Sequence, residues 1–199
     1  MATWLVAGLG NPGPAYASTR HNVGFMVADE LAARARVSFS APRGMRADVC
    51  ETRLAASGMG GVGADAQRVV LLKPRTFMND SGAALAKACA YYKIPPEHVI
   101  VVHDELDLDF GRLRVKSGGG DNGHNGLKSI RAALGTGDFL RVRFGIGRPP
   151  GRQDARDYVL APIPANLRED YAVETARNAD AVELLIAAGL VPAQNRFNS

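Results

Sequence analysis

The chain has 199 residues, of which 46% are hydrophobic and 22% charged, a composition typical of one globular domain whose core needs no disulfides. Cys50 and Cys89 lie far apart and form no CxxC pair, so two reduced, buried thiols are expected rather than a disulfide framework or a metal knot. No apolar run reaches the roughly 20 residues of a membrane helix, and the first residues lack signal-peptide features, so a cytoplasmic location is expected.

The first half of the chain alternates between predicted strands and helices. The short apolar run 4–9 ends at glycine and indicates a buried strand. A Gly/Pro-rich loop follows, and a helix is expected over about 22–36, with one apolar face. Strands are expected over 47–56 and 68–72. The glycine-rich segment at about 57–66 between them is expected to be an exposed, mobile loop.

The second half continues the alternation. A helix capped by Asn79 or Ser81 is expected to end near Tyr92. A strand over 99–102 should end at the pair 103–104, and a short strand is expected over 113–116. A helix over 125–134, a half-exposed strand over 139–147 and a last helix over 171–188 follow. This order predicts an α/β fold, a single domain spanning the chain with a central sheet flanked by helices.

Charge is unevenly distributed along a chain whose formal net charge is +4. Between Arg112 and Arg156 ten basic residues accompany three acidic ones, whereas from Asp157 onward six acidic residues outnumber three basic ones. A basic block of this kind is typical of a surface that docks a polyanion. A solvated basic face with no partner fits the same composition equally well.

The segment from Gly8 to Gly13 formally matches the GxGxxG pattern of dinucleotide-binding folds. In those folds a helix begins directly at the glycines, so that its N-terminus meets the pyrophosphate. Pro12 and Pro14 prevent a helix there. The nearest acidic residues, Asp29 and Glu30, fall inside a predicted helix rather than at the end of a strand. The sequence therefore argues against a nicotinamide or flavin cofactor.

Two interpretations of the histidines are open. His21 closes the loop that leaves the first strand, and Asp104 follows the strand over 99–102. If those strands are neighbours, the carboxylate can orient the imidazole and stabilise its protonated form. Alternatively, His103 and Asp104 are the metal pair of an HD-type phosphohydrolase, completed by His21 and Asp121. Such enzymes are all-helical, and no tight ligand spacing such as HExxH supports a metal.

The sequence contains neither the GxSxG elbow of a serine nucleophile nor a P-loop lysine, which favours direct activation of water by a general base.

Three asparagines lie in glycine-flanked or turn-rich segments: Asn11, Asn79 and Asn125. An amide offers donors and an acceptor without adding charge, which suits it to hold a peptide backbone or a carbonyl. Each alone is more simply explained as a turn or capping residue. Their convergence on one cleft would favour the binding role.

Six segments carry a further pattern: 8–13 (GLGNPG), 19–24 (TRHNVG), 73–79 with 81–82 (KPRTFMN and SG), 103–107 (HDELD), 116–120 running into 123–128 (KSGGG and GHNGLK), and 143–149 (RFGIGRP). In this order and spacing they resemble the bacterial peptidyl-tRNA hydrolases, and the match runs nearly from end to end. The glycine-rich loop 57–66 departs from the family by its length and does not interrupt these segments.

The resemblance implies an α/β fold with a mixed central sheet, acting as a monomer without metal or cofactor. It implies hydrolysis of the ester bond between a peptide and the 3′ end of its tRNA, which recycles tRNA after premature release from the ribosome. His21 would be the general base, Asp104 would hold it in its working state, and Asn11 would help to distinguish blocked peptidyl-tRNA from free aminoacyl-tRNA. The positions implied to contact the substrate are Tyr16, Phe77, Met78, Asn79 and Asn125.

The resemblance also suggests a role for part of the basic block. Arg114 and Lys116 lie on the stretch implied to approach the acceptor-stem phosphates, and Arg141, Arg143 and Arg148 are expected to add to this field. Together they would supply mainly salt-dependent tRNA affinity. An RNA-binding protein of the same fold without hydrolysis is the alternative. The histidine–aspartate pair argues against it, because binding alone needs no base.

Overall fold

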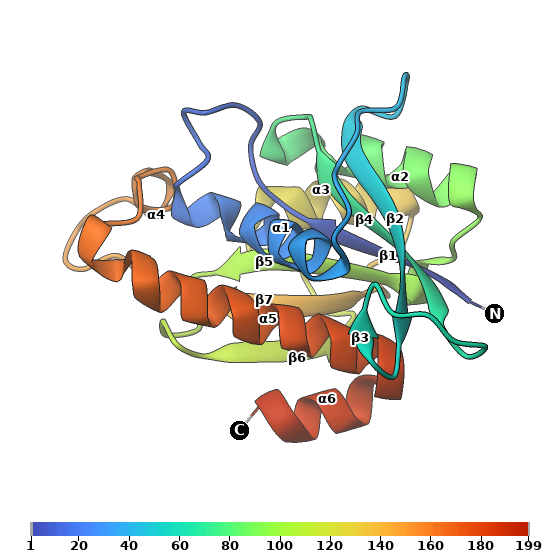
Figure 1. The fold of residues 1–199 in the computed structure, drawn as a ribbon. Coiled ribbons are helices and arrows are strands. Elements are labelled where there is room, and N and C mark those ends of the chain that lie inside the picture. Colours follow the sequence, from blue (N-terminus) through green and yellow to red (C-terminus); the bar gives the residue numbers. More distant parts are fainter. Residues whose placement is uncertain (1, 199) are drawn as a thin grey trace.

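The computed structural model describes residues 2–198, which form a single α/β domain built on one mixed sheet (Figure 1). The strands are β1 (Thr3–Gly8), β2 (Ala47–Ala55), β3 (Gly58–Met59), β4 (Gln67–Pro74), β5 (Val99–Glu105), β6 (Leu113–Ser117) and β7 (Leu140–Gly145). Their order across the sheet is β3-β2-β4-β1-β5-β7-β6. The central strands β4, β1, β5 and β7 run parallel, whereas β2, β3 and β6 pair antiparallel with their neighbours.

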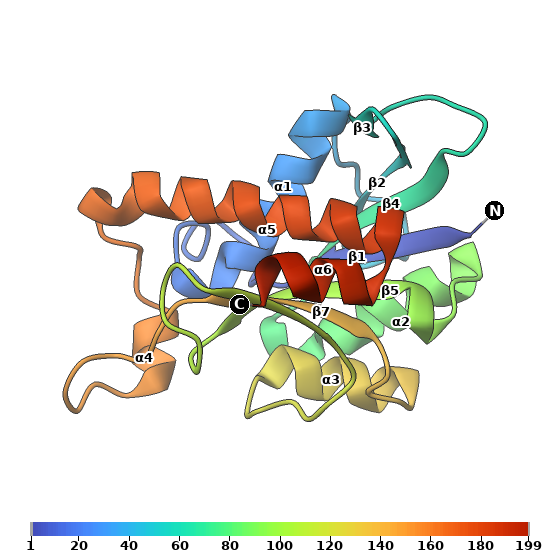
Figure 2. The same ribbon diagram turned by 90° about the horizontal axis from the view of Figure 1, so that it is seen from below.

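Helices cover both faces of the sheet, as Figure 2 shows from below. They are α1 (Val23–Ala35), α2 (Ser81–Tyr92), α3 (Asn125–Leu134), α4 (Ala155–Val159), α5 (Arg168–Ala188) and α6 (Leu190–Phe197). Helices α2 and α3 pack on one face, and α1, α5 and α6 pack on the other. None of the helices in residues 2–198 combines the length and the apolar character needed to cross a membrane.

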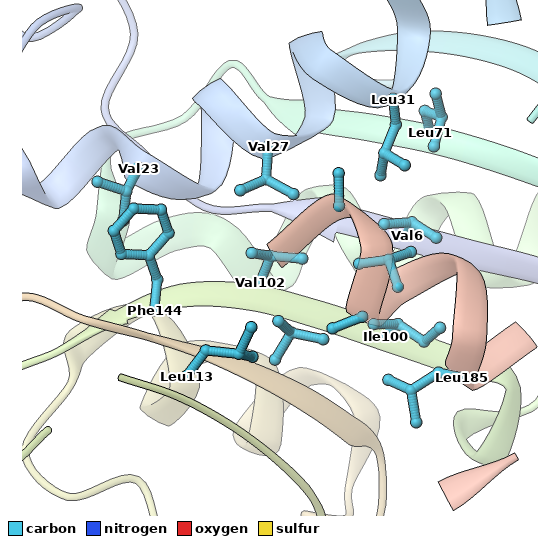
Figure 3. Packing of buried hydrophobic residues seen from close by; sticks show 14 of the residues in the cluster. Val6, Val23, Val27, Leu31, Leu71, Ile100, Val102, Leu113, Phe144 and Leu185 are labelled. Carbon is cyan, nitrogen blue, oxygen red and sulfur yellow. The ribbon is translucent and has the colours of Figure 1, made fainter. Parts of the chain in front are cut away.

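Side-chain alternation along the strands divides the core into two layers. In β1, Leu5 and Ala7 face α2 and α3, whereas Val6 lies in the opposite layer. Figure 3 shows Val27 and Leu31 of α1 packed in that layer with Val6. The four-residue spacing of the apolar residues in α1 produces this single buried face.

A close backbone approach joins α1 to the carboxyl ends of β1 and β5. A Cβ atom added at Gly8 would lie 2.0 Å from the carbonyl oxygen of Gly24, and one added at Gly24 would lie 2.5 Å from that of Val102. Only glycines permit this contact. Because His21 lies in the turn just before α1, the contact holds it beside the end of β5.

Several predicted boundaries differ from the structure. The strand predicted over 99–102 continues to Glu105, so His103 and Asp104 lie within β5. Neither expected residue caps α2: Asp80 is its N-cap, without a side-chain hydrogen bond, and Ser81 Oγ donates to the Met78 carbonyl instead. Helix α5 begins at Arg168, three residues before its predicted start. The helices α4 and α6 were not predicted.

The glycine-rich loop 57–66 is only partly exposed, contrary to expectation. Met59 is buried, pairs with Leu54 across a short hairpin, and its N–H donates to Glu183 of α5 over 2.8 Å. Val62, in contrast, is 88% exposed. The segment is therefore anchored at its start and exposed at its tip.

Both cysteines are free thiols, as expected. Cys50 is buried, whereas Cys89 is only half-buried.

Candidate active site

A cleft of about 540 Å³ opens at the carboxyl ends of β1 and β5. Eight residues singled out as catalytic or substrate-contacting all line it: Asn11, Tyr16, His21, Phe77, Met78, Asn79, Asp104 and Asn125. Leu106, Val159 and Leu160 add apolar walls that the sequence did not indicate. The three asparagines therefore converge on one cavity: Asn11 comes from the loop after β1, Asn79 from the 3-10 turn before α2, and Asn125 from the first turn of α3.

His21 and Asp104 form the hydrogen-bonded pair expected from neighbouring strands, since β1 and β5 are adjacent and parallel. His21 Nδ1 lies 2.7 Å from Asp104 Oδ2, and Asp104 is 3% exposed. Burial alone would raise the pKa of Asp104, but the charges of His21 and His124 and their hydrogen bonds hold it well below its usual range. Asp104 is thus a carboxylate, and His21 Nδ1 is the donor.

The pKa of His21 is raised above the ordinary histidine value. Burial acts to lower it, and the charge of Asp104 together with the hydrogen bond to its carboxylate outweighs that effect. With Nδ1 donating to Asp104, Nε2 of neutral His21 carries a free lone pair. This nitrogen can accept a proton from a water molecule in the cleft.

Asn11 is fixed by hydrogen bonds on its backbone and its side chain. Its N–H donates to Asn22 Oδ1 and its carbonyl accepts from Asn22 Nδ2, both over 2.9 Å. Asn11 Oδ1 accepts from the Met78 N–H over 2.7 Å. The side-chain oxygen is therefore occupied, and Nδ2 is the group that Asn11 can offer as a donor. The side chains of Asn79 and Asn125 make no hydrogen bond to any residue within 2–198.

An aromatic pair forms part of the cleft wall. The rings of Tyr16 and Phe77 meet edge to face with centroids 6.3 Å apart. Phe77 is 57% exposed, which is unusual for a large apolar side chain. An exposed aromatic face can stack on a nucleobase.

His124 is a site residue that the sequence did not indicate. It is the N-cap of α3, its side chain is 6% exposed, and its Nε2 lies 2.8 Å from Asp104 Oδ1. Its ring centroid lies 5.2 Å from that of His21. The sequence placed it in the segment 123–128 that carries the resemblance, immediately before a predicted helix, but no role was assigned to it.

The cluster His21, Asp104 and His124 brings its potential metal-ligating atoms within 4.8 Å of one another. The donor set fits a metal poorly. His124 Nδ1 accepts the N–H groups of Gly126 and Leu127, so Nε2 of the neutral ring carries the proton and has no lone pair for a metal. The cluster is better described as a hydrogen-bonded network.

The alternative His103–Asp104 metal pair is wrong. His103 is buried and does not line the cleft, its Nδ1 lies 2.8 Å from the Asp104 carbonyl oxygen, and burial lowers its pKa to about 3. Asp121 accepts from the Gly123 N–H at the start of the loop before α3. The α/β fold is also unlike the all-helical architecture that this alternative requires.

The basic residues of β6 and β7 differ in how accessible they are. Arg114 is exposed and Lys116 is half-buried. Arg143 pairs with Glu105 over 2.6 Å, and Arg148 pairs with Asp107. Arg141 is only 1% exposed and donates to the carbonyls of three glycines. Arg141 can therefore add to the positive field only from within the protein, without contacting phosphate directly.

Comparison with known proteins identifies the relatives of this chain. A family model described as peptidyl-tRNA hydrolase matches residues 5–199. The peptidyl-tRNA hydrolase of Cutibacterium acnes is 59% identical over 197 residues, covering 99% of this chain and 98% of that protein. The one from Frankia casuarinae is 55% identical over 196 residues, covering 98% and 94%. The crystal structure of peptidyl-tRNA hydrolase from Acinetobacter baumannii matches with a TM-score of 0.85 at 34% identity, covering 99% of this chain and 95% of that one.

Proposed function

The chain belongs to the peptidyl-tRNA hydrolase family, and we propose that it performs the family's reaction with His21 as the general base. The reaction hydrolyses the ester bond of peptidyl-tRNA and releases tRNA and peptide. The observation that carries the assignment of the base is the 2.7 Å hydrogen bond from His21 Nδ1 to buried Asp104. The family match does not favour a protein of this fold that only binds RNA.

His21 would begin the reaction by removing a proton from water. Its Nε2 accepts that proton while the water oxygen attacks the ester carbonyl carbon. The imidazolium that forms lies against the Asp104 carboxylate, which stabilises the positive charge. On collapse of the tetrahedral intermediate the C–O bond to the ribose breaks, and the imidazolium returns the proton to the departing ribose oxygen.

The asparagines would stabilise the substrate and the intermediate. Asn11 can offer Nδ2 to the cleft as a donor, because the bond from the Met78 N–H fixes the side on which its Oδ1 lies. Asn79 and Asn125 line the same cavity. Amide donors aimed at a developing oxyanion are worth about 3–4 kcal/mol each in other hydrolases. Asn11 Nδ2 can donate to the acyl carbonyl that blocks the amino group, and a free aminoacyl ester has no such carbonyl, which supports a preference for peptidyl over free aminoacyl esters.

Exposed cations beside the cleft would bind the tRNA backbone. Arg114 and Lys116 lie on edge strand β6, and their cross-strand partners on β7 are Arg143 and Arg141. We assign the acceptor-stem phosphates to Arg114 and Lys116. Arg143 is paired with Glu105 and would add to the positive potential without contacting a phosphate.

The terminal nucleoside and the first peptide residue would be held by Tyr16, Phe77 and Met78. We also propose that the protein acts as a monomer in the cytoplasm, where its substrate is found.

Cleavage of N-acetyl-aminoacyl-tRNA by the wild type and His21→Ala tests the proposal. We expect His21→Ala to lower kcat by about 10²–10⁴-fold, the usual contribution of a general base. His98→Ala is the matched control, because His98 stacks on Trp4 and precedes β5 at the end opposite Asp104. Free aminoacyl-tRNA and EDTA serve as chemical controls. Full activity in His21→Ala would exclude His21 as the base.

A further inference from the structure

We infer that His124 is a positioning residue: through Asp104 it fixes which histidine acts as the base and limits how tightly His21 holds its proton. The inference rests on the proposed function of His21. It concerns a residue that is not required to touch the substrate.

Hydrogen-bond direction determines the tautomer of His124. Its Nδ1 lies 3.1 Å from the Gly126 nitrogen and 3.4 Å from the Leu127 nitrogen. A backbone N–H can only donate, so Nδ1 must accept and carries no proton. The proton of the neutral ring is therefore on Nε2, which donates to Asp104 Oδ1 over 2.8 Å. Protonating Nδ1 would break the N-cap of α3, so this ring is held as a permanent donor.

The two imidazoles on Asp104 are therefore not equivalent. Each donates to one carboxylate oxygen, His21 through Nδ1 and His124 through Nε2. The distal nitrogen of His21 is free, whereas the distal nitrogen of His124 is tied to the backbone of α3. Only His21 has a lone pair with which to take a proton from water. Helix capping thus selects the base.

Sharing of one carboxylate also affects the basicity of His21. A hydrogen bond donated to Asp104 Oδ1 draws negative charge away from Oδ2, and so weakens the attraction of Asp104 for the proton of His21.

Other ionisable groups surround this network. His103 packs edge-on to His124 with centroids 5.0 Å apart, and Glu105, Arg148 and Arg156 line the cleft. Glu105 and Arg148 are already in ion pairs with other residues.

The variant His124→Asn separates capping from donation. Asparagine is among the best N-cap residues, so α3 keeps its cap. Its shorter side chain, engaged in the cap, cannot also donate to Asp104. We expect kcat to fall about tenfold with KM within about twofold, as for loss of one charge-assisted hydrogen bond. The apparent pKa of the base in the profile of kcat/KM against pH should rise by about 0.5–1 unit, because Asp104 then pulls harder on the proton of His21.

A purely structural role for His124 predicts a different result. Loss of cleft shape would lower kcat without moving the pH profile, and that outcome would overturn the inference. Histidine ¹⁵N NMR of the wild type provides a second measurement that needs no variant. We expect the neutral ring of His124 to carry its proton on Nε2 and that of His21 to carry it on Nδ1; a neutral His124 ring with its proton on Nδ1 would also overturn the inference.

The two proposals fail in distinguishable ways. If His21→Ala hydrolyses the substrate normally, the proposed base is wrong. If His21→Ala is inactive but His124→Asn leaves both kcat and the pH profile unchanged, only the role of His124 is wrong. Thermal unfolding of His124→Asn, compared with the wild type, confirms that the measured protein is folded.

Discussion

Asp104→Asn should abolish most hydrolysis while preserving both hydrogen bonds at this position. His124 can only donate from Nε2, so it requires the oxygen of the new amide on its side, 2.8 Å away. The amide nitrogen then faces His21 Nδ1, where the carboxylate oxygen now lies at 2.7 Å. That nitrogen donates, so His21 Nδ1 must accept and its proton moves to Nε2. The lone pair needed to activate water is lost from the cleft.

The size of the effect follows from the chemistry removed. A base held in the wrong tautomer loses nearly the whole contribution of general base catalysis, and the analogous Asp→Asn change in a serine protease triad costs about 10⁴-fold. We therefore expect kcat/KM to fall about 10³–10⁴-fold, equivalent to roughly 4–5.5 kcal/mol in activation free energy. Single-turnover hydrolysis of N-acetyl-aminoacyl-tRNA, with enzyme in excess over substrate but below KM and near neutral pH, measures this loss without interference from product release.

A second variant tests the cause of the loss. In Asp104→Asn combined with His124→Asn, the donor that fixed the amide is absent, so the amide can turn its oxygen toward His21 and restore the productive tautomer. This double variant should be about tenfold more active than Asp104→Asn alone. Either of two results would refute the reasoning. Asp104→Asn could keep kcat/KM within tenfold of the wild type, or the double variant could be no more active than Asp104→Asn.

Three further predictions follow from the charges. Because the pKa of His21 is raised and the base must be neutral, kcat/KM of the wild type should rise with pH to a half-maximum above the ordinary histidine value; a flat profile over about pH 5–8 would contradict this. Because burial lowers the pKa of His103 to about 3, only the unfolded chain takes up this proton between about pH 6.5 and 3. As the pH is lowered through that window, the free energy of unfolding in urea should therefore decrease, with at most about 1.4 kcal/mol per pH unit from this one group, and a free energy that does not decrease would contradict it. Lys116→Ala should reduce the slope of log affinity for tRNA against log salt by about one, and Arg114→Ala should do the same; unchanged slopes would remove both residues from the interface.

The approach of His21 to Asp104 could be predicted because it depends on topology. Apolar runs that end in polar residues mark the ends of parallel strands, and such ends meet when the strands are neighbours. The Gly8–Gly24 contact that brings α1 onto β1 was not predicted, because a glycine does not show which backbone segment lies against it. The role of His124 was hidden, because its hydrogen bond to Asp104 depends on how α3 docks against the sheet.

The missed helices have local reasons. Helix α4 has five residues, too few to show a period, and depends on tertiary contacts. Tyr158 lies under the Arg20 guanidinium, 4.1 Å from the ring centroid, and its hydroxyl donates to the Ile146 carbonyl. Helix α6 contains Pro192, which suggests a break but falls in the first turn, where no intrahelical N–H bond is lost. The burial of Arg141 likewise cannot be inferred from its charge.

The two edges of the sheet determine whether it can be extended by another chain. Strand β3 has only two residues. At the opposite edge, Asn198 Oδ1 accepts from the Val115 N–H and Asn198 Nδ2 donates to the Val115 carbonyl, both over 2.8 Å. One amide side chain thus makes the two hydrogen bonds that an added strand would make in the middle of β6. Sheet-to-sheet association through β6 would first require the displacement of Asn198, so the edge strand that carries Arg114 and Lys116 is protected from pairing with a second protein.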